Sequence, residues 1–258
     1  ACRGGWPSAL FKNSDKSKLL VAQSYFEGLC REDISNIDGK TRDETVTTLL
    51  LRSYARNIST TAANTSILRD IRANTDIGET TFYEYVAALK KLFVIQDIEA
   101  WCPAIRSKSS IQSGNKREFV DPSLVVSALG VEPDYFNFDL KTFGFIFETL
   151  CIRDLKIYSN ALGGRVSYYR DRYGLEADCV LHLRDGKYAL IEFKLGSSEI
   201  DEGAKHLNEI EKLVEEYNKT EKQCLLRAPD LKIVITGTQY GYKRPDGVYV
   251  VPIGCLRD

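Results

Sequence analysis

Hydrophobic residues in the first hundred positions recur at the three- and four-residue spacing of amphipathic helices. Between residues 16 and 34 the apolar side chains fall on one helical face, and the same spacing continues over 41–58. Two shorter helices are predicted at 66–73 and 80–92, the second capped by threonine with Glu84 near the third helical position. The first part of the chain is therefore predicted to be helical.

The break at residues 74–78 separates the two short helices, a pattern typical of a helix-turn-helix. The following run, 93–98, is rich in β-branched residues and predicts a wing strand, so a winged-helix unit is expected over about 41–101. A helix that reads DNA bases usually carries basic and amide side chains. The second short helix instead offers aromatic residues and threonines, with two acids nearby, Glu79 and Glu84. DNA binding and protein contact therefore stay open as alternative roles.

Short apolar runs in the second half predict strands. Residues 176–181 and 188–194 are expected to pair as a hairpin, because the segment 184–187 between them contains an Asp-Gly turn pair. A helix over 197–218 and strands at 231–236 and 248–252 should follow, joined to the hairpin by a right-handed crossover. The expected fold class is α+β, with a helical and winged-helix region followed by an α/β domain built on a mixed sheet.

Four ionisable residues stand out against this apolar background. Side chains alternate between the two faces of a strand, so Glu192 and Lys194 should point to the same side. The hairpin can bring Asp178 to the same place, and Glu148 lies in an otherwise apolar helix, 143–158, where a lone carboxylate needs a partner or a metal. Carboxylates suit magnesium, which also takes phosphate oxygens and water. The alternative is a solvated strand end with a salt bridge of little energetic value.

The segment from about 143 to 213 resembles the PD-(D/E)XK nuclease superfamily, whose pattern is helix-Glu, strand-Asp, hairpin, strand-Glu-x-Lys and helix. The resemblance implies a restriction-endonuclease-like fold and four catalytic residues. Asp178, Glu192 and Glu148 would bind one or two magnesium ions, and Lys194 would orient or polarise the attacking water. Magnesium can generate a hydroxide and stabilise an in-line displacement, as phosphodiester hydrolysis requires.

Basic side chains near the expected pocket are candidates for phosphate contact. The loop 106–117 is polar and basic, and the arginines at 165, 170 and 172 precede Asp178 in the sequence. Weaker substrate candidates are Glu176, Arg170, Arg172 and Lys205, the last facing the pocket only if its helix begins near residue 198 or 199. A net charge of -1 and a pI near 6.3 do not mark the whole chain as a nucleic-acid binder. Only a local basic patch can be argued, and an ordinary solvated loop is the alternative.

A second resemblance covers nearly the whole chain. It rests on five segments: 4–7 (Gly-Gly-Trp-Pro), 30–34, 79–86, 116–122 and 169–178. Together they are similar to the carboxyl-terminal half of a prokaryotic group of AAA-type ATPases that carry a conserved domain of unestablished function.

The resemblance implies an ATPase domain upstream. The phosphate-binding motif G-x-x-x-x-G-K-[ST] does not occur here, because Ile34 stands where the first glycine would precede Gly39-Lys40-Thr41. Magnesium is therefore the one cofactor expected, and ATP would act only through the upstream domain. The predicted domains are a linker region at 1–40, the winged-helix-like domain at 41–125 and the nuclease-like domain at 126–258.

Composition narrows the class of protein. The 258 residues include no methionine, so the chain is expected to be a fragment or to lack native methionines. No apolar run is long enough to span a bilayer and no signal peptide precedes the helices, so a cytoplasmic protein without membrane contact is expected. The odd number of cysteines, seven, has no C-x-x-C pair and predicts buried thiols at Cys30, Cys151 and Cys179. His182 and His206 are interpreted as ordinary structural histidines.

Three functions fit these observations. The first, which we favour, is a magnesium-dependent nuclease acting on DNA or RNA. The second is a nuclease-like adaptor that contacts nucleic acid or protein without cleavage. The third is a structural support for an ATPase homo-oligomer, which the predicted cluster of three acids argues against, since mutual repulsion would destabilise it without a cation.

Overall fold

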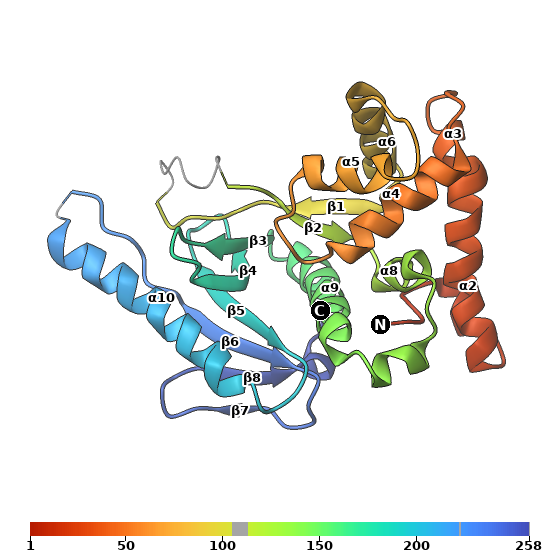
Figure 1. Ribbon diagram of the computed structural model, residues 1–258. Helices are drawn as coiled ribbons and strands as arrows, with labels where there is room; N and C mark the ends of the chain where they lie inside the picture. Colours follow the sequence, from red (N-terminus) through yellow and green to blue (C-terminus); the bar gives the residue numbers. More distant parts are fainter. Residues whose placement is uncertain (105–112, 222, 258) are drawn as a thin grey trace. The chain divides into compact units, whose positions relative to one another are not determined.

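A computed structural model describes residues 1–104, 113–221 and 223–257. The chain divides into two compact units, shown in the sequence colours of Figure 1. The first unit comprises Ala1–Asp97 and Gly114–Leu150, and the second comprises Ile98–Ser113 and Cys151–Asp258. The expected domain ranges 1–40, 41–125 and 126–258 place their boundaries elsewhere and stay a prediction.

The first unit is mainly helical. Its strands β1 (Ile95–Ile98) and β2 (Lys116–Phe119) form a two-stranded sheet. Its helical segments are α1 (Pro7–Leu10), α2 (Asp15–Gly28), the π-helical turn η1 (Leu29–Asp33), α3 (Ile34–Asn36), α4 (Glu44–Arg56), α5 (Asn64–Arg72), α6 (Glu79–Lys91), α8 (Pro122–Leu129), the 3-10 turn η2 (Pro133–Asn137) and the first half of α9 (Leu140–Asn160).

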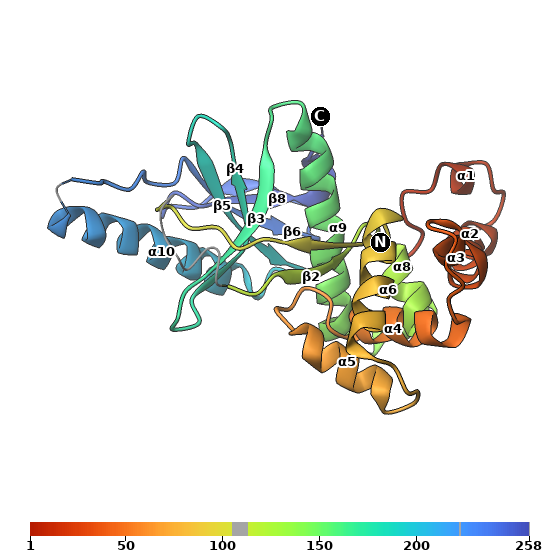
Figure 2. The same cartoon turned by 90° about the horizontal axis from the view of Figure 1, so that it is seen from above.

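The helices expected from periodicity are confirmed to within a few residues, and Figure 2 shows them from above. One detail is wrong: α6 is capped by Gly78, and the threonines expected to cap it already lie inside the helix. Gly78 has the extended backbone of an N-cap residue (φ -70°, ψ 151°), so helical geometry starts at Glu79.

The core of the first unit is an apolar cluster contributed by α2, α4, α5, α6 and α8. On α4, Leu50, Leu51 and Tyr54 are completely buried, and the edge of the Tyr54 ring meets Phe119 of β2 at 5.9 Å between centroids. Burying such side chains stabilises the fold by about 1.5–3 kcal/mol each. This helix packs against α5 and α8, so it holds the unit together.

Two sequence segments that carried the resemblance to AAA-type ATPases meet in this unit. The backbone N–H of Gly5 donates to Asp121 (2.9 Å), and the indole N–H of Trp6 donates to Ser123 (2.8 Å), although these pairs are 116 and 117 residues apart. Asp121 also caps α8 by accepting from the backbone of Ser123. The amino-terminal segment is thereby anchored to the start of α8.

Gly4 makes this close approach possible. Its φ is +73°, and a Cβ built on it would lie 2.3 Å from Ser123 Oγ, so Gly4→Ala should lower the free energy of unfolding by about 1–3 kcal/mol. Gly130 is the matched control, because its φ is +68° but a Cβ there would meet nothing within 4 Å. Urea titrations of both variants test this. Equal losses in the two variants would show that the contact with α8 contributes nothing beyond backbone strain.

The second unit is built on a six-stranded mixed sheet in the order β3-β4-β5-β6-β8-β7. Strands β3, β4 and β5 are antiparallel neighbours, whereas β5, β6 and β8 run parallel. Helix α10 (Ile200–Thr220) connects β5 to β6 and packs on both of them. The strand bounds are Arg165–Arg170 (β3), Glu176–His182 (β4), Tyr188–Lys194 (β5), Leu231–Thr236 (β6), Tyr242–Lys243 (β7) and Tyr249–Pro252 (β8), and a 3-10 turn, η3 (Ile253–Cys255), follows.

The α+β class, the hairpin, the crossover helix and the strands after it are confirmed by these elements. Gly186 has the positive φ (+85°) that the Asp-Gly turn requires. Cys30, Cys151 and Cys179 are buried as predicted. Within the described ranges, no helix is both long and apolar enough to cross a membrane.

Candidate functional site

Asp178 and Glu192 lie at the paired ends of β4 and β5. The antiparallel register places Cys179 opposite Ile191, so one further step along each strand puts Asp178 opposite Glu192. Asp178 Oδ2 accepts a hydrogen bond of 2.9 Å from the backbone N–H of Phe193, which fixes this carboxylate against the neighbouring strand. The expectation that the hairpin brings Asp178 and Glu192 together therefore agrees with the register.

Lys194 forms an ion pair with Glu192, as strand alternation predicts. Its Nζ lies 3.0 Å from Glu192 Oε2, and the two side chains are 17% and 3% exposed. Burial alone would lower the pKa of Lys194, but the charges of Glu192 and Asp178 outweigh burial and raise that pKa. Lys194 is therefore a cation at neutral pH, and the pocket combines two carboxylates with one ammonium group.

Helix α10 contributes two residues that the sequence did not reveal. A Cβ on Gly203 would lie 3.1 Å from Lys194 Cε and 3.3 Å from Glu192 Cβ, so glycine allows the helix to approach the pair. One helical turn later, His206 Nδ1 lies 3.7 Å from Glu192 Oε1. The structural interpretation of His206 from the sequence missed this contact. The signal available was its spacing of three from Gly203, which places both on one helical face.

Glu148 belongs to the first unit. Its carboxylate accepts a 2.8 Å hydrogen bond from Lys116 of β2, and the two side chains are 10% and 1% exposed. The expectation that this buried carboxylate has a partner is confirmed. Its place in a metal shell with Asp178 and Glu192 stays a prediction.

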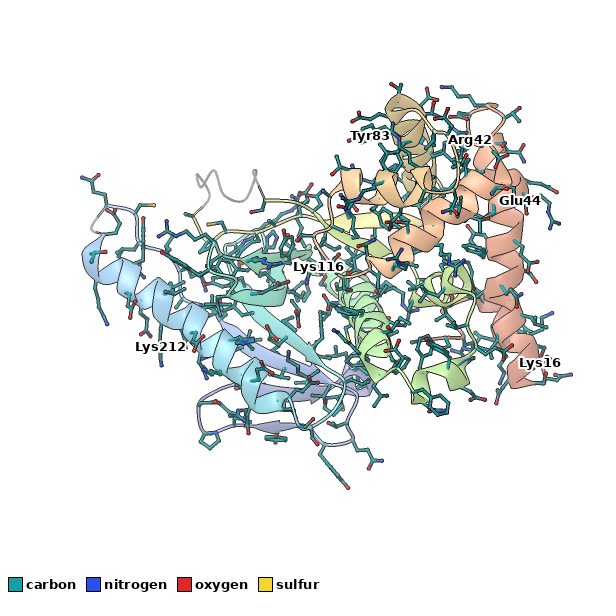
Figure 3. All side chains as sticks on the ribbon, in the orientation of Figure 1. Lys16, Arg42, Glu44, Tyr83, Lys116 and Lys212 are labelled. Carbon is teal, nitrogen blue, oxygen red and sulfur yellow. The ribbon has the colours of Figure 1, made fainter. Side chains whose placement is uncertain are left out.

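The basic segment 106–117 was expected to be an exposed loop that contacts phosphate, and this is wrong for its last two residues. Lys116 and Arg117 lie in β2 and are 1% and 7% exposed. Lys116, labelled in Figure 3, pairs with Glu148, and Arg117 pairs with Asp97 at 3.0 Å. Because both cations are buried and paired with acids, Lys116 and Arg117 cannot form a surface patch that contacts phosphate. Residues 106–112 of the segment lie outside the described residues.

The weaker substrate candidates are placed as follows. Arg170 and Glu176 are opposite each other in the β3–β4 register and form a 3.7 Å ion pair. Arg172 stacks over the ring of Tyr173, 4.7 Å from its centroid. Lys205 is largely exposed and lies 3.8 Å from Glu209, one turn further along α10. The helix begins at Ile200, so it is Gly203 and His206, rather than Lys205, that contact Glu192 and Lys194.

The fit to magnesium rests on Asp178 and Glu192. Among the described residues, no three His, Cys, Asp or Glu side chains gather in a group that could hold a metal ion. Magnesium is commonly held by only one or two carboxylates, with phosphate oxygens and water completing six ligands. Two adjacent carboxylates therefore suit a magnesium ion that arrives with a phosphate substrate, although such an ion would compete with Lys194 for Glu192.

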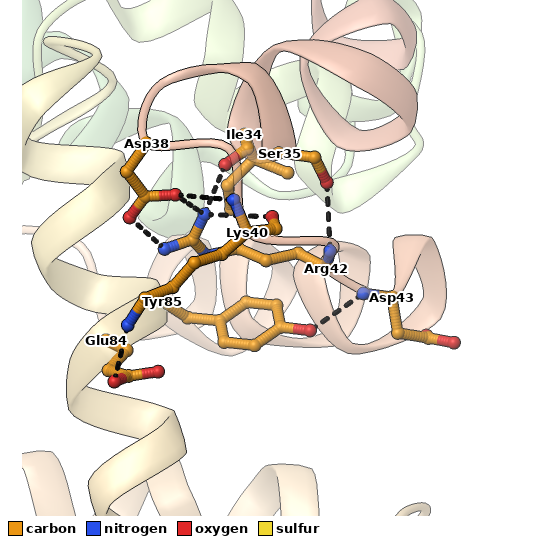
Figure 4. Close-up of polar contacts among 8 residues, drawn as sticks. All are labelled: Ile34, Ser35, Asp38, Lys40, Arg42, Asp43, Glu84 and Tyr85. Atoms are coloured by element: carbon orange, nitrogen blue, oxygen red, sulfur yellow. Dashed lines mark hydrogen bonds and ion pairs between the residues drawn. The ribbon is translucent and has the colours of Figure 1, made fainter.

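The segment around Gly39-Lys40-Thr41 is held by a different set of contacts, shown in Figure 4. The two terminal guanidinium nitrogens of Arg42 donate hydrogen bonds to the carboxylate of Asp38 (2.6 and 2.7 Å). The guanidinium also lies over the ring of Tyr85 on α6. The hydrogen bonds from Arg42 keep the pKa of Asp38 well below its usual range. Lys40 pairs with Glu84 at 2.8 Å. These contacts tie the segment to α6.

Comparison with known families gives two matches. Residues 1–135 match a domain of unknown function, DUF8612, and residues 143–256 match another, DUF4143. DUF4143 is found in the carboxyl-terminal region of AAA-type ATPase-associated proteins, which agrees with the resemblance seen in the sequence. No curated protein and no solved structure matches the chain.

Proposed function

The chain belongs to the DUF8612 family, and from the chemistry of its second unit we propose that it is a magnesium-dependent nuclease-like module of an AAA-type ATPase, acting on the phosphodiesters of nucleic acid. The observation that carries this proposal is the arrangement of Asp178, Glu192 and Lys194 at the adjoining ends of β4 and β5. Burying two acids and a lysine at strand ends costs folding free energy, so stability by itself does not explain why they are there. Their arrangement suits a phosphate substrate.

Each residue has a distinct role in the proposal. Asp178 and Glu192 hold the metal ion, with phosphate oxygens and water as its other ligands. When bound, magnesium lowers the pKa of a water ligand and neutralises charge on the phosphate. Lys194 has a raised pKa and stays protonated, so it orients the attacking water and stabilises negative charge on the phosphoryl oxygens rather than removing a proton.

The same proposal assigns the first unit the role of a contact module. Helices α4, α5 and α6 followed by β1 and β2 have the element order of a winged helix. Tyr83 on α6 is 44% exposed, and Glu84 on the same helix is paired with Lys40. This pairing offsets one of the acids that argued against nucleic-acid contact. Binding of nucleic acid or of a protein partner, assembly into a homo-oligomer and a cytoplasmic location remain parts of the proposal.

A non-catalytic adaptor is the second candidate, and two ion pairs favour it. Glu148 is paired with Lys116, and Glu192 is paired with Lys194. A cation bound by either acid must compete with an ammonium group already in place. In an adaptor these pairs would be permanent, and nucleic acid or protein would bind without cleavage.

The substitution Lys194→Gln separates the two candidates. Removing a positioned cation from a phosphoryl-transfer site should reduce cleavage by about 10²–10³-fold, while magnesium binding should persist or strengthen because Glu192 loses its competitor. Calorimetric titration of magnesium and manganese is combined with cleavage assays on plasmid and single-stranded nucleic acid. Lys219→Gln, on the exposed end of α10, is the control. Absence of cleavage and of metal binding in the unmodified protein would leave the adaptor.

A further inference from the structure

A basic cavity lies in the second unit, away from the carboxylates of β4 and β5. Its volume is about 360 Å³, and it is lined by Gly163, Arg165, His182, Leu183 and Arg184. It forms where the turn after α9 meets the hairpin between β4 and β5. Asp178 is near the start of β4 and His182 is at its end, so about 13 Å of extended strand separates them at roughly 3.3 Å per residue.

The β3–β4 pairing brings the positive groups of this cavity together. Arg165 and His182 are direct partners in the antiparallel register, and Arg184 follows two residues later. His182 Nε2 is 3.1 Å from the hydroxyl of Ser167, which leaves Nδ1 without a hydrogen-bond partner among the described residues. Burial, together with the charge of Arg165, lowers the pKa of His182 and keeps its ring neutral. The imidazole therefore adds a hydrogen-bonding group without adding a third positive charge.

The charges of the two arginines are not balanced by acids among the described residues. Within 1–104, 113–221 and 223–257, neither Arg165 nor Arg184 forms an ion pair with a carboxylate. Asp185 is next to Arg184 in sequence, but Lys187 engages it through both its backbone N–H (3.0 Å) and its ammonium group (2.9 Å). Most other arginines of the second unit do have acidic partners: Arg153, Arg170, Arg227 and Arg244. Arg165 and Arg184 thus bring two guanidinium charges without an acidic partner among the described residues to one cavity.

We propose that the cavity formed by Arg165, His182 and Arg184 binds a phosphate group. Guanidinium groups present a planar set of N–H donors that matches the oxygens of phosphate, and such charge-assisted hydrogen bonds are stronger than neutral ones. The volume is at the lower end of that of small-molecule sites, so a phosphate with an attached nucleoside can be accommodated. The phosphate belongs either to a nucleic-acid strand or to a small phosphate compound.

The site does not depend on the carboxylates or on a metal ion. All measurements are therefore made with the full chain in EDTA, at constant ionic strength, since screening alters binding to exposed charges. Inorganic phosphate is titrated against tryptophan fluorescence, because Trp101 lies 6.2 Å from the ring of His182. A dye-labelled hexathymidylate is titrated by fluorescence anisotropy. Because these measurements are made without metal, a failed nuclease assay would not count against the phosphate site.

Arg165→Gln and Arg184→Gln are each expected to weaken binding by about tenfold, the effect of losing one charge-assisted hydrogen bond. Lys212→Gln is the charge-matched control, since Lys212 lies exposed on α10, where Figure 3 labels it. Thermal melting confirms that each variant is folded. If the arginine variants bind the hexathymidylate more weakly than the control does, the ligand is a phosphate of a nucleic-acid strand. If they bind only inorganic phosphate more weakly, the ligand is a small phosphate compound. If both probes bind the arginine variants and the lysine control equally well, or bind none of them, the proposal is overturned.

Discussion

Replacing Asp178 and Glu192 together with alanine is expected to abolish magnesium binding and to reduce metal-dependent cleavage of nucleic acid by at least about a thousandfold. The two carboxylates come from adjacent strands of the second unit, and in the proposal they hold the magnesium ion that activates water. The variant also removes the two largest charge contributions that raise the pKa of Lys194. Burial then dominates, so the pKa of Lys194 should fall.

Calorimetric titration of magnesium and manganese measures the first effect, and plasmid nicking measures the second. The isosteric variant Asp178→Asn/Glu192→Gln controls for packing, because it keeps the hydrogen-bonding shape of both side chains while removing their charge. Metal binding and nicking should disappear in both double variants. Retention of metal binding would place the metal elsewhere in the protein, and retention of cleavage without metal would contradict the proposed chemistry.

Asp97→Asn is expected to destabilise the first unit by about 3–5 kcal/mol, the usual cost of leaving a buried charge without its partner. Asp97 receives a short hydrogen bond from the hydroxyl of Tyr54, and its other oxygen lies 2.6 Å from Lys90 and 3.0 Å from Arg117. The side chains of Asp97 and Arg117 are 5% and 8% exposed. Without the carboxylate, the guanidinium of Arg117 would remain buried and uncompensated.

Urea denaturation measures this loss in a Trp101→Phe background, where fluorescence comes from Trp6 of the first unit. The control is Glu84→Gln, which breaks the exposed Lys40–Glu84 pair of Figure 4. Exposed pairs contribute at most about 1 kcal/mol, so the control should change stability by less than that. Similar effects from the two substitutions would mean that burial of the Asp97 network contributes little.

The same network gives an acid dependence with a definite sign. Burial by itself raises the pKa of Asp97, but hydrogen bonds from Lys90 and Tyr54, with the charge of Arg117, outweigh burial and lower it. A folded-state pKa below the unfolded value contributes stability that is present above the unfolded pKa, about 3.9 for Asp. That contribution is lost as pH falls through the lower, folded-state pKa. The stability difference between the unsubstituted protein and Asp97→Asn should therefore shrink in acid.

Turn chemistry and strand alternation, which involve only neighbouring residues, predicted the hairpin and the pairing of Glu192 with Lys194 in the candidate site. The hairpin followed from the Asp-Gly pair at 185–186, and the common orientation of Glu192 and Lys194 followed from strand alternation. Both depend only on residues close in sequence, so a single sequence contains the information. The strand β3 and helix α8 were not predicted, and the cap of α6 was assigned to threonine rather than Gly78. Helix α8 did have local signals, because Asp121 and Pro122 at its start and Gly130 after its end are residues typical of helix boundaries.

The sequence by itself determined where most helices and strands form, and which acids and lysine share the end of a hairpin, because backbone periodicity and turn chemistry act over a few residues. Only the tertiary structure decided which charges are buried together and which stay unpaired. Lys116 and Arg117, expected on a loop, are neutralised by Glu148 and Asp97, whereas Arg165 remains without an acid among the described residues. Residues far apart in the chain supply these partners. The residues next to a charged side chain therefore do not specify which opposite charge it will meet in the folded protein.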